Sequence, residues 1–164
     1  MKQLSIFVLM MVIAVGSAFS KDRASAHTTV KGRDVSVTYG QPKMKGRTIF
    51  GGLVPYGQVW RTGADEATEI TLTKGGMFAG RQLDPGTYTL YTIPEKGEWT
   101  IILNSELKQW GAFNYDKIKE KNVLETRVAA TTLDKPVETF TIDIKDNGIT
   151  LSWEKTSVFL EVRN

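Results

Sequence analysis

The chain has 164 residues, a formal net charge of +3 and no cysteine. This length suits one domain with a substantial core and is too short for two ordinary ones. The lack of cysteine excludes a disulfide-built scaffold, thiol nucleophiles and cysteine-ligated zinc. The charge is small and evenly spread, so no nucleic-acid partner is expected.

The first twenty residues have the pattern of a secretory signal peptide. Lys2 precedes an apolar run over residues 4–15, which is shorter than a membrane-spanning helix and is followed by small residues. We expect residues 1–20 to be removed, after Ala18 or Ser20. Ala26 offers a later junction that would leave His27 at the new N-terminus, and a retained anchor is the less favoured interpretation. The product is expected to be secreted or periplasmic, without a stable membrane anchor.

Residues 21–32 are expected to form an N-terminal tail, and residues 33–164 one β-sandwich domain. Apolar and polar side chains alternate in six stretches, at 35–39, 70–73, 99–103, 140–144, 149–153 and 158–162. This period of two predicts half-buried antiparallel strands. Turn residues separate them: Gly75-Gly76, Asp84-Pro85-Gly86, Pro94 to Gly97, and Asn147-Gly148. The sequence therefore predicts an all-β fold, an antiparallel β-sandwich that is jelly-roll-like, with a closed barrel as the alternative.

Little helix is expected in this pattern. Ser105 could cap one short turn that runs to Trp110, before Gly111 stops it. Among the aromatic residues outside the predicted core, we expect Tyr91, Phe113 and Tyr115 to be exposed. Residues 117–121 are expected to be a solvated turn.

Residues 39–66 break the regular alternation. Six glycines fall between Gly40 and Gly63, and Pro42 and Pro55 restrain the same stretch, which indicates a shaped loop. A guanidinium can hold a carboxylate or phosphate at two points, and an aromatic face can stack on a sugar. The candidate binding residues are Lys45, Arg47, Tyr56, Trp60, Arg61, Asp65 and Glu66. The structural alternative is that Arg61 or Arg47 pairs with Asp65 or Glu66 while the two aromatic residues fill the core.

Several ordered motifs make the chain recognisable. They are Tyr39-Gly40-Gln41-Pro42, Lys45-Gly46-Arg47, Ile49-Phe50-Gly51, Val54-Pro55-Tyr56-Gly57, residues 60–68 (WRTGADEAT), Gly86-Thr87-Tyr88, Ile93-Pro94, Trp99-Thr100 and Trp110-Gly111. Together they resemble DUF2911, a bacterial secreted family known as a domain of unknown function. The resemblance covers most of the chain after the tail and implies a compact, β-rich, exported domain. It implies no particular activity.

The usual catalytic arrangements find little support. His27 is the only histidine, no G-x-S-x-G motif accompanies it, and it is interpreted as a solvated or edge-strand residue. No metal site and no cofactor are expected, because Asp146-Asn147-Gly148 lacks the other acidic ligands of a calcium loop and is better explained as a hairpin turn. Glu66 is a weak catalytic candidate. If residues 65 and 66 are extended, their side chains point to opposite faces and cannot flank one glycosidic bond.

Three functional hypotheses remain from the sequence. The preferred one is an exported binding module whose loop 39–66 recognises an anionic or polar small molecule, or a glycan or cell-wall fragment. The second is a hydrolase that uses Glu66 beside Arg61. The third is a self-associating envelope protein with a structural role.

Overall fold

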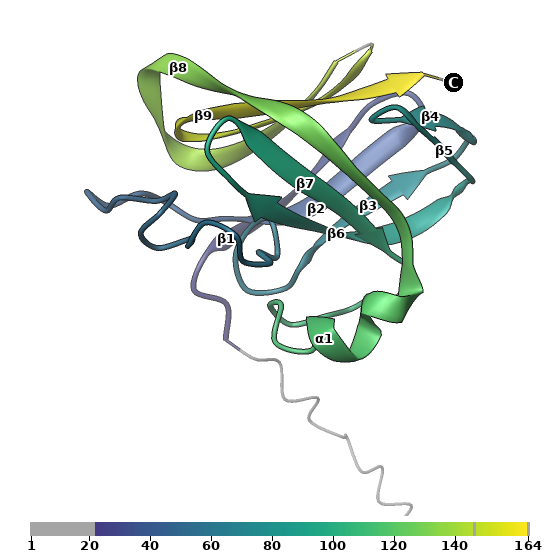
Figure 1. Ribbon diagram of the computed structural model, residues 1–164, viewed down its shortest axis with the longest axis horizontal. Coiled ribbons are helices and arrows are strands. Elements are labelled where there is room, and N and C mark those ends of the chain that lie inside the picture. Colours follow the sequence, from purple (N-terminus) through teal and green to yellow (C-terminus); the bar gives the residue numbers. More distant parts are fainter. Residues whose placement is uncertain (1–21, 146, 164) are drawn as a thin grey trace, which may run out of the picture.

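The computed structural model describes residues 22–145 and 147–163, and the predicted signal peptide lies outside them. The prediction of an all-β antiparallel fold is confirmed. Within these described residues, nine strands form one hydrogen-bonded sheet in the order β1-β2-β3-β6-β7-β8-β9-β4-β5 (Figure 1). The strands are β1 (Ala26–Lys31), β2 (Val35–Gln41), β3 (Thr68–Leu72), β4 (Gly76–Phe78), β5 (Arg81–Leu83), β6 (Gly86–Pro94), β7 (Glu98–Asn104), β8 (Asn122–Lys145) and β9 (Gly148–Arg163).

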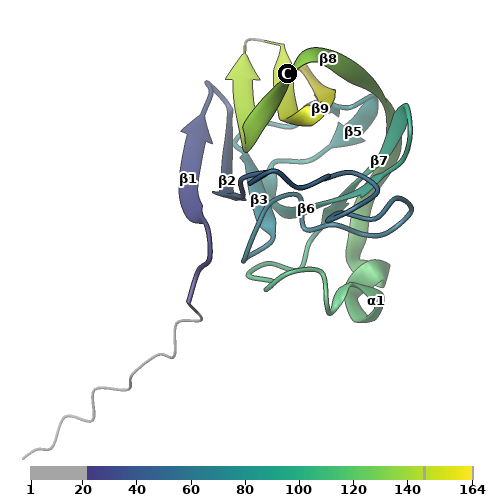
Figure 2. The ribbon, with the colours of Figure 1, turned by 90° about the vertical axis from the view of Figure 1, so that its left-hand side faces the viewer.

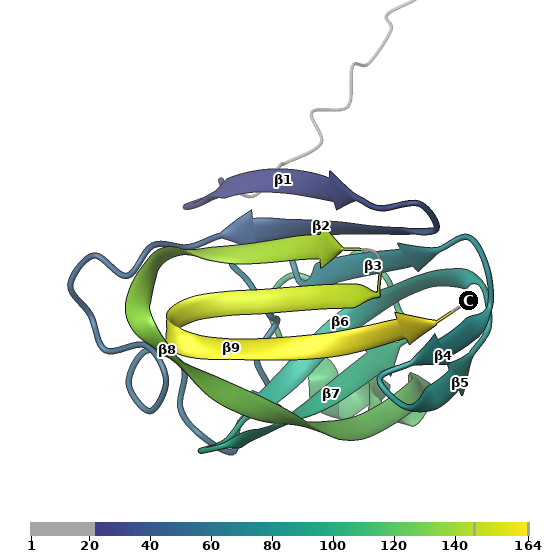
Figure 3. The same cartoon turned by 90° about the horizontal axis from the view of Figure 1, so that it is seen from above.

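The sheet folds over itself along β8. This strand is 24 residues long, and its pairing with β9 shifts register between Thr132 and Val137 and again before Thr141. Such irregularities bend a strand. In Figure 3, the C-terminal half of β8 and the whole of β9 lie over the layer that contains β2, β3 and β6. The backbone N–H of Ile142 in β8 accordingly donates a 2.9 Å hydrogen bond to the hydroxyl oxygen of Tyr39 in β2.

The folded sheet encloses an aromatic core. Trp60 is at its centre, with ring centroids 5.1 Å from Phe140 and 5.8 Å from Trp153. Phe50 packs against Trp99 at 4.9 Å. Alternating side chains from strands on both sides meet here, as the period of two predicts. The core therefore contains residues of the glycine-rich segment as well as residues of the strands.

The structure corrects two of the local predictions about the backbone. The segment expected to be an N-terminal tail contains β1, which pairs with β2 from Ala26↔Gln41 to Lys31↔Ser36 and lies at one side of the molecule (Figure 2). The turn predicted at residues 105–110 is not helical. Lys108 has a φ of 58°, which a right-handed helix cannot accommodate, and its N–H donates to Oε1 of Glu69.

The helical residues lie further along, in α1 (Tyr115–Ile118) and a 3-10 turn, η1 (Lys119–Lys121). Residues 117–121, expected to be a solvated turn, belong to these two short elements. Against expectation, Tyr91 is almost fully buried and Tyr115 is partly buried, because the two rings pack with centroids 5.2 Å apart. Burial raises the pKa of the Tyr91 hydroxyl to about 12. Phe113 is exposed, as predicted.

None of the helices in the described ranges has the length and apolar character that crossing a membrane requires.

Candidate functional site

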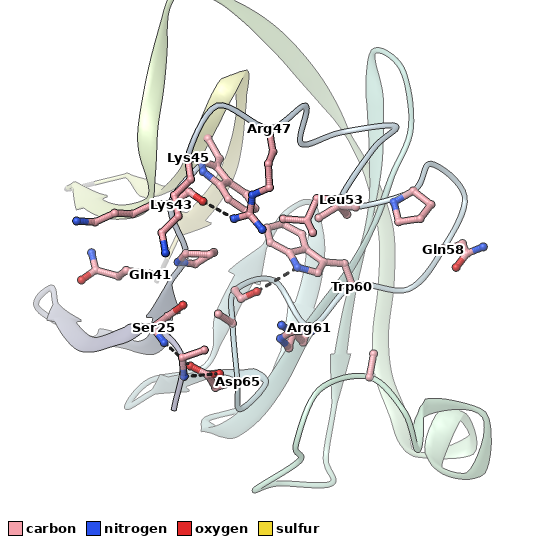
Figure 4. Close-up of a pocket in the computed structure, with 18 of the residues that line it drawn as sticks. Ser25, Gln41, Lys43, Lys45, Arg47, Leu53, Gln58, Trp60, Arg61 and Asp65 are labelled. Carbon is pink, nitrogen blue, oxygen red and sulfur yellow. Dashed lines mark hydrogen bonds between the residues drawn. The ribbon is translucent and has the colours of Figure 1, made fainter. Parts of the chain in front are cut away.

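A cavity of about 900 Å³ lies between the glycine-rich segment, the start of β1 and the loop before α1. Figure 4 shows side chains from these regions, with Trp60 and Arg61 near the centre and Lys43 and Lys45 to one side. The volume is within the range of about 300–1,000 Å³ that is usual for small-molecule sites. The concavity that the sequence predicted from the glycine-rich segment is therefore present.

The backbone of this segment adopts unusual conformations. Lys45, Thr62 and Asp65 all have positive φ values, of 50°, 56° and 62°. For a β-branched residue such as Thr62 this is a rare conformation, and such residues cost on the order of 1–3 kcal/mol each. The carbonyl of Thr62 accepts a 2.6 Å hydrogen bond from the hydroxyl of Thr68. Neighbouring structure thus holds the segment in shape.

Two glutamates of the last strands fix the first half of the segment. The carboxylate of Glu154 accepts hydrogen bonds of 3.2 Å from the backbone N–H groups of Ile49 and Phe50. Glu138 accepts a 3.0 Å hydrogen bond from the N–H of Lys45. Because both glutamates lie about a hundred residues away in sequence, tertiary structure rather than local turn chemistry positions these residues.

Arg61 has the least satisfied polar group in the cavity wall. The backbone of its neighbour Trp60 exchanges hydrogen bonds of 2.8 and 3.0 Å with the backbone of Thr92 in β6. These bonds fix the position of the backbone from which the Arg61 side chain extends. Its Nε is buried and has no hydrogen-bond partner within residues 22–145 and 147–163. Burial lowers the pKa of Arg61, and the negative charge of Asp65 partly opposes this. An arginine keeps its positive charge at neutral pH in any case.

The charge of the wall is predominantly positive. Of the described residues that line the cavity, four are cationic and only one, Asp65, is acidic. The cations are Lys43, Lys45, Arg47 and Arg61. Arg47 is already partly engaged, since its Nε and Nη2 donate to the carbonyls of Met44 and Lys43 at 2.9 and 2.7 Å. The sequence did not single out Lys43, because one lysine next to a proline carries no local signal.

Asp65 and Glu66 have different partners, although the backbone at Asp65 is not extended, as was supposed from the sequence, but has a φ of 62°. Asp65 lines the cavity, and its two oxygens accept hydrogen bonds from the N–H groups of Ala24 and Ser25 at 3.1 and 3.0 Å. Glu66 is not among the lining residues. It binds Arg23, whose Nε donates to both carboxylate oxygens at 2.9 and 3.1 Å. The structural alternative paired Arg61 or Arg47 with one of these carboxylates; among the ion pairs of the described residues Glu66 is bound by Arg23 instead.

His27 is the other neighbour of this acidic pair. Its Nε2 lies 3.0 Å from Oε2 of Glu66, an ion-pair distance without the direction of a hydrogen bond, and its Nδ1 lies 3.1 Å from the carbonyl oxygen of Ser25. The side chain is only 12% exposed. Two environments were expected for His27, an edge strand or solvent. It lies in the edge strand β1 and is not solvated.

These contacts set the pKa of Glu66. Burial raises it, and the hydrogen bond from Arg23, together with the charges of Arg23 and His27, outweighs the burial, so the pKa of Glu66 is lowered. A general base works best when its pKa is near the working pH, and the lowered pKa of Glu66 moves it away from that value. Because Glu66 also lies outside the cavity lining, its position and its ionisation give the hydrolase hypothesis no support.

The two aromatic candidates have different positions. Trp60 is 7% exposed and belongs to the core, although it also lines the cavity. Its Nε1 donates a 3.1 Å hydrogen bond to the carbonyl of Gly63. Tyr56 is 37% exposed, lies outside the lining, and covers Gly51, where an added Cβ would come within 2.7 Å of its ring. The exposed apolar residues at the cavity are instead Leu53 and Phe113.

No group of three or more histidine or acidic side chains in the described parts of the chain is placed to hold a metal ion.

Comparison with protein families gives one match over nearly the whole domain. The family model described as "Protein of unknown function (DUF2911)" matches residues 21–162. The chain belongs to the DUF2911 family. This confirms the resemblance that the motifs between Tyr39 and Gly111 indicated. The matched range includes Arg23 and His27 and therefore extends over the segment that the sequence suggested was a tail.

Partial similarity connects the chain to larger mycobacterial enzymes. It is 34% identical over 95 residues to the 5-methyltetrahydropteroyltriglutamate--homocysteine methyltransferases of Mycobacterium tuberculosis (strain ATCC 25618 / H37Rv) and Mycobacterium bovis (strain BCG / Pasteur 1173P2). The corresponding identity is 32% for the Mycobacterium leprae (strain TN) protein. The match covers 58% of this chain and 12% of each relative. The named activity belongs to those whole proteins. No solved structure matches the chain significantly.

Proposed function

We propose that this DUF2911 protein is an exported β-sandwich module that binds a small anionic molecule, such as an acidic sugar or a cell-wall fragment, in the cavity beside residues 39–66. The observation that carries the proposal is Arg61. Its Nε is buried at the cavity wall without a hydrogen-bond partner in the described chain. A buried donor left unpaired is costly, so a rotation of the Arg61 side chain that brings the guanidinium to an acceptor oxygen of a ligand in the cavity is favourable.

The charge balance favours an anion over a neutral ligand. Lys43 and Lys45 line the same cavity as Arg61, and Asp65 is the one acidic residue among the described lining residues. The oxygens of Asp65 already accept hydrogen bonds from two backbone N–H groups. A carboxylate or phosphate of the ligand therefore meets positive charge that internal acids do not neutralise.

The size and the rim favour a ligand that also has an apolar face. About 900 Å³ is enough for a molecule of disaccharide size. Phe113 is 81% exposed and Leu53 is 48% exposed, and both line the cavity. An exposed aromatic ring beside a polar pocket is suited to stacking on the flat face of a sugar.

Backbone strain supports a binding role for the same segment. Lys45, Thr62 and Asp65 keep positive φ values, and hydrogen bonds between Lys45 and Glu138 and between Thr62 and Thr68 hold two of them in place. Strained backbone commonly concentrates at functional sites, where it prepares a binding geometry in advance. The proposed export rests on the sequence pattern of residues 1–20 and would be tested by fractionation of cells that express the full chain.

The test is thermal unfolding of the protein with a panel of anions: inorganic phosphate, citrate, galacturonate, N-acetylmuramic acid and a nucleoside monophosphate. A ligand at one hundred times its Kd stabilises the native state by about 2.7 kcal/mol, which raises the midpoint by several degrees. We expect at least one panel member to do so for the wild type and to lose the effect in Arg61→Lys, which keeps the charge but loses the two-point guanidinium geometry.

The matched control is Arg127→Lys. Arg127 is 74% exposed and pairs with Glu98 at 3.4 Å, away from the cavity lining. This variant should respond to the anion as the wild type does. Equal stabilisation of wild type and Arg61→Lys would contradict the role of Arg61, and a panel with no response from the wild type would contradict anion binding itself.

A further inference from the structure

The residues just before β1 are attached to the candidate site by several hydrogen bonds. Arg23 reaches Glu66 through Nε, and its Nη2 lies 2.7 Å from Oε1 of the same carboxylate. The N–H groups of Ala24 and Ser25 each donate to a different oxygen of Asp65. A short chain segment is thus bound to two consecutive carboxylates, one through charge and one through its backbone.

The same segment forms part of the cavity wall. Ala24, Ser25 and Ala26 line it, together with Gln41 and Asp65. Ala26 is also the first residue of the β1–β2 ladder, paired with Gln41. If these residues were removed, the carboxylate of Asp65, which is 9% exposed in their presence, would lose both of these N–H donors. The cavity would also lose this part of its wall.

His27, the residue after Ala26, attaches the segment to β2. His27 is close to the backbone of β2, since a Cβ added at Gly40 would lie 3.0 Å from Nε2 of His27 and 2.3 Å from the carbonyl oxygen of Ala64. Nδ1 of His27 is within hydrogen-bond distance of the carbonyl of Ser25. The bond between Ala26 and His27 therefore joins two residues that are both built into the folded domain.

This arrangement bears on how the chain is processed. The sequence offers two kinds of junction for a signal peptidase: small residues around Ala18 and Ser20, and the small pair at Ala24 and Ala26. We infer that Ala24–Ala26, which Arg23 anchors to Glu66, form a permanent wall of the cavity, so that processing during export leaves Arg23–Ala26 on the mature chain and cuts upstream of Arg23. The inference concerns the proposed site and the proposed export, but it does not require the ligand to be identified.

The direct test is the N-terminus of the exported protein. The full chain is expressed in a bacterial host, the protein is isolated from the exported fraction, and its intact mass is measured. We expect a mass that includes Arg23–Ala26. A product that begins at His27, or at any residue after Arg23, would overturn the inference.

Hydrogen exchange tests the wall without reference to processing or ligand. In the wild type, the amides of Ala24 and Ser25 should exchange more slowly than in an unfolded chain, because both are hydrogen-bonded to Asp65. Asp65→Asn offers one carbonyl oxygen in place of two carboxylate oxygens, and asparagine tolerates the positive φ at this position. This variant should lose protection at these amides.

The matched control is Asp143→Asn, since Asp143 is exposed in β8. This variant should keep the wild-type protection. Exchange of Ala24 and Ser25 at the unfolded rate in the wild type would overturn the wall, whatever the ligand panel shows. If Ala24 and Ser25 are protected from exchange and no anion raises the unfolding midpoint, the role of this segment as a cavity wall stands and only the proposed function is rejected.

Discussion

The indole rings of Trp60 and Trp153 stack with centroids 5.8 Å apart and planes inclined by 19°. Both residues are at least 93% buried, and both contribute to the cavity wall. The floor of the candidate site is thus also the centre of the hydrophobic core. A change in this floor alters the stability of the protein as well as the shape of the cavity.

Substitution of Trp60 should accordingly act on folding. We expect Trp60→Ala to reduce the free energy of unfolding by about 3–5 kcal/mol, because it removes a large buried side chain and leaves a cavity. Trp60→Phe keeps most of the ring and should cost less. Denaturant unfolding followed by circular dichroism measures both values. An alanine variant as stable as the wild type would mean that Trp60 does not belong to the core.

Glu154 tests whether the segment is prepared for its ligand from a distance. Glutamine at this position has one carbonyl oxygen, so it cannot accept from both Ile49 and Phe50 as the carboxylate does. We expect Glu154→Gln to lower the free energy of unfolding by about 1–2 kcal/mol. The same variant should also reduce the affinity of the cavity for any anion that it binds, although Glu154 is outside the cavity lining.

The matched control for this variant is Glu161→Gln. Glu161 is a partly exposed residue of β9 that pairs with Arg163, and its loss should have little effect on either quantity. Unchanged stability and unchanged anion affinity in Glu154→Gln would show that the two N–H groups find other partners.

Acid should release Arg23 from Glu66. Because the pKa of Glu66 is lowered in the folded state, the unfolded state binds a proton more readily, and the ion pair stabilises the fold above the ordinary pKa of 4.5. This contribution is lost as the pH falls below that value toward the folded-state pKa. Urea unfolding at several pH values between 7 and 3 should therefore show a shallower decline for Glu66→Gln than for the wild type.

The control for the pH series is Glu98→Gln. Glu98 is 53% exposed and pairs with Arg127 on the surface, so its removal should leave the pH dependence nearly unchanged. A decline in Glu66→Gln as steep as that of the wild type would assign the acid sensitivity to other carboxylates.

Gly40 should not tolerate a side chain. A Cβ at this position would lie 2.3 Å from the carbonyl oxygen of Ala64, so the turn that carries Asp65 would have to move away from β2. We expect Gly40→Ala to cost about 1–3 kcal/mol of folding free energy and to increase hydrogen exchange at residues 24 and 25. A variant with wild-type stability would show that this turn adjusts without cost.

Much of the fold could be predicted from alternation and turn residues. The hairpin expected near Asn147-Gly148 is present, but Lys145 pairs with Gly148, so this glycine belongs to β9 and not to the turn. The connection from Pro94 to Gly97 closes with a hydrogen bond from the N–H of Glu95 to the carbonyl of Glu98. The strand β1 was missed because its sequence, AHTTVK, has one strongly apolar residue. The first half of β8 was missed because most of its side chains are not buried, so no period of two stands out.

The segment that forms the site could be located from the sequence, but the contacts between its residues could not be predicted. Glycines and prolines marked the segment, and Arg61 and Lys45 do line the cavity. Trp60 was predicted to contact ligand although it mainly packs in the core, because composition does not tell a core tryptophan from an exposed one. Arg23 and His27 could not be assigned to Glu66, since a contact across about forty residues depends on how β1 pairs with β2.

If the proposed site is correct, the cavity binds a negatively charged group through Arg61. The most direct measurement compares two sugars that differ by one carboxylate: N-acetylmuramic acid, which carries a lactyl carboxylate, and N-acetylglucosamine, which does not. Calorimetric titration of the wild-type protein should show binding of the acid and at least tenfold weaker binding of the neutral sugar, with the difference abolished in Arg61→Lys. Equal binding of both sugars, or a preference for the acid that survives in Arg61→Lys, would contradict the account.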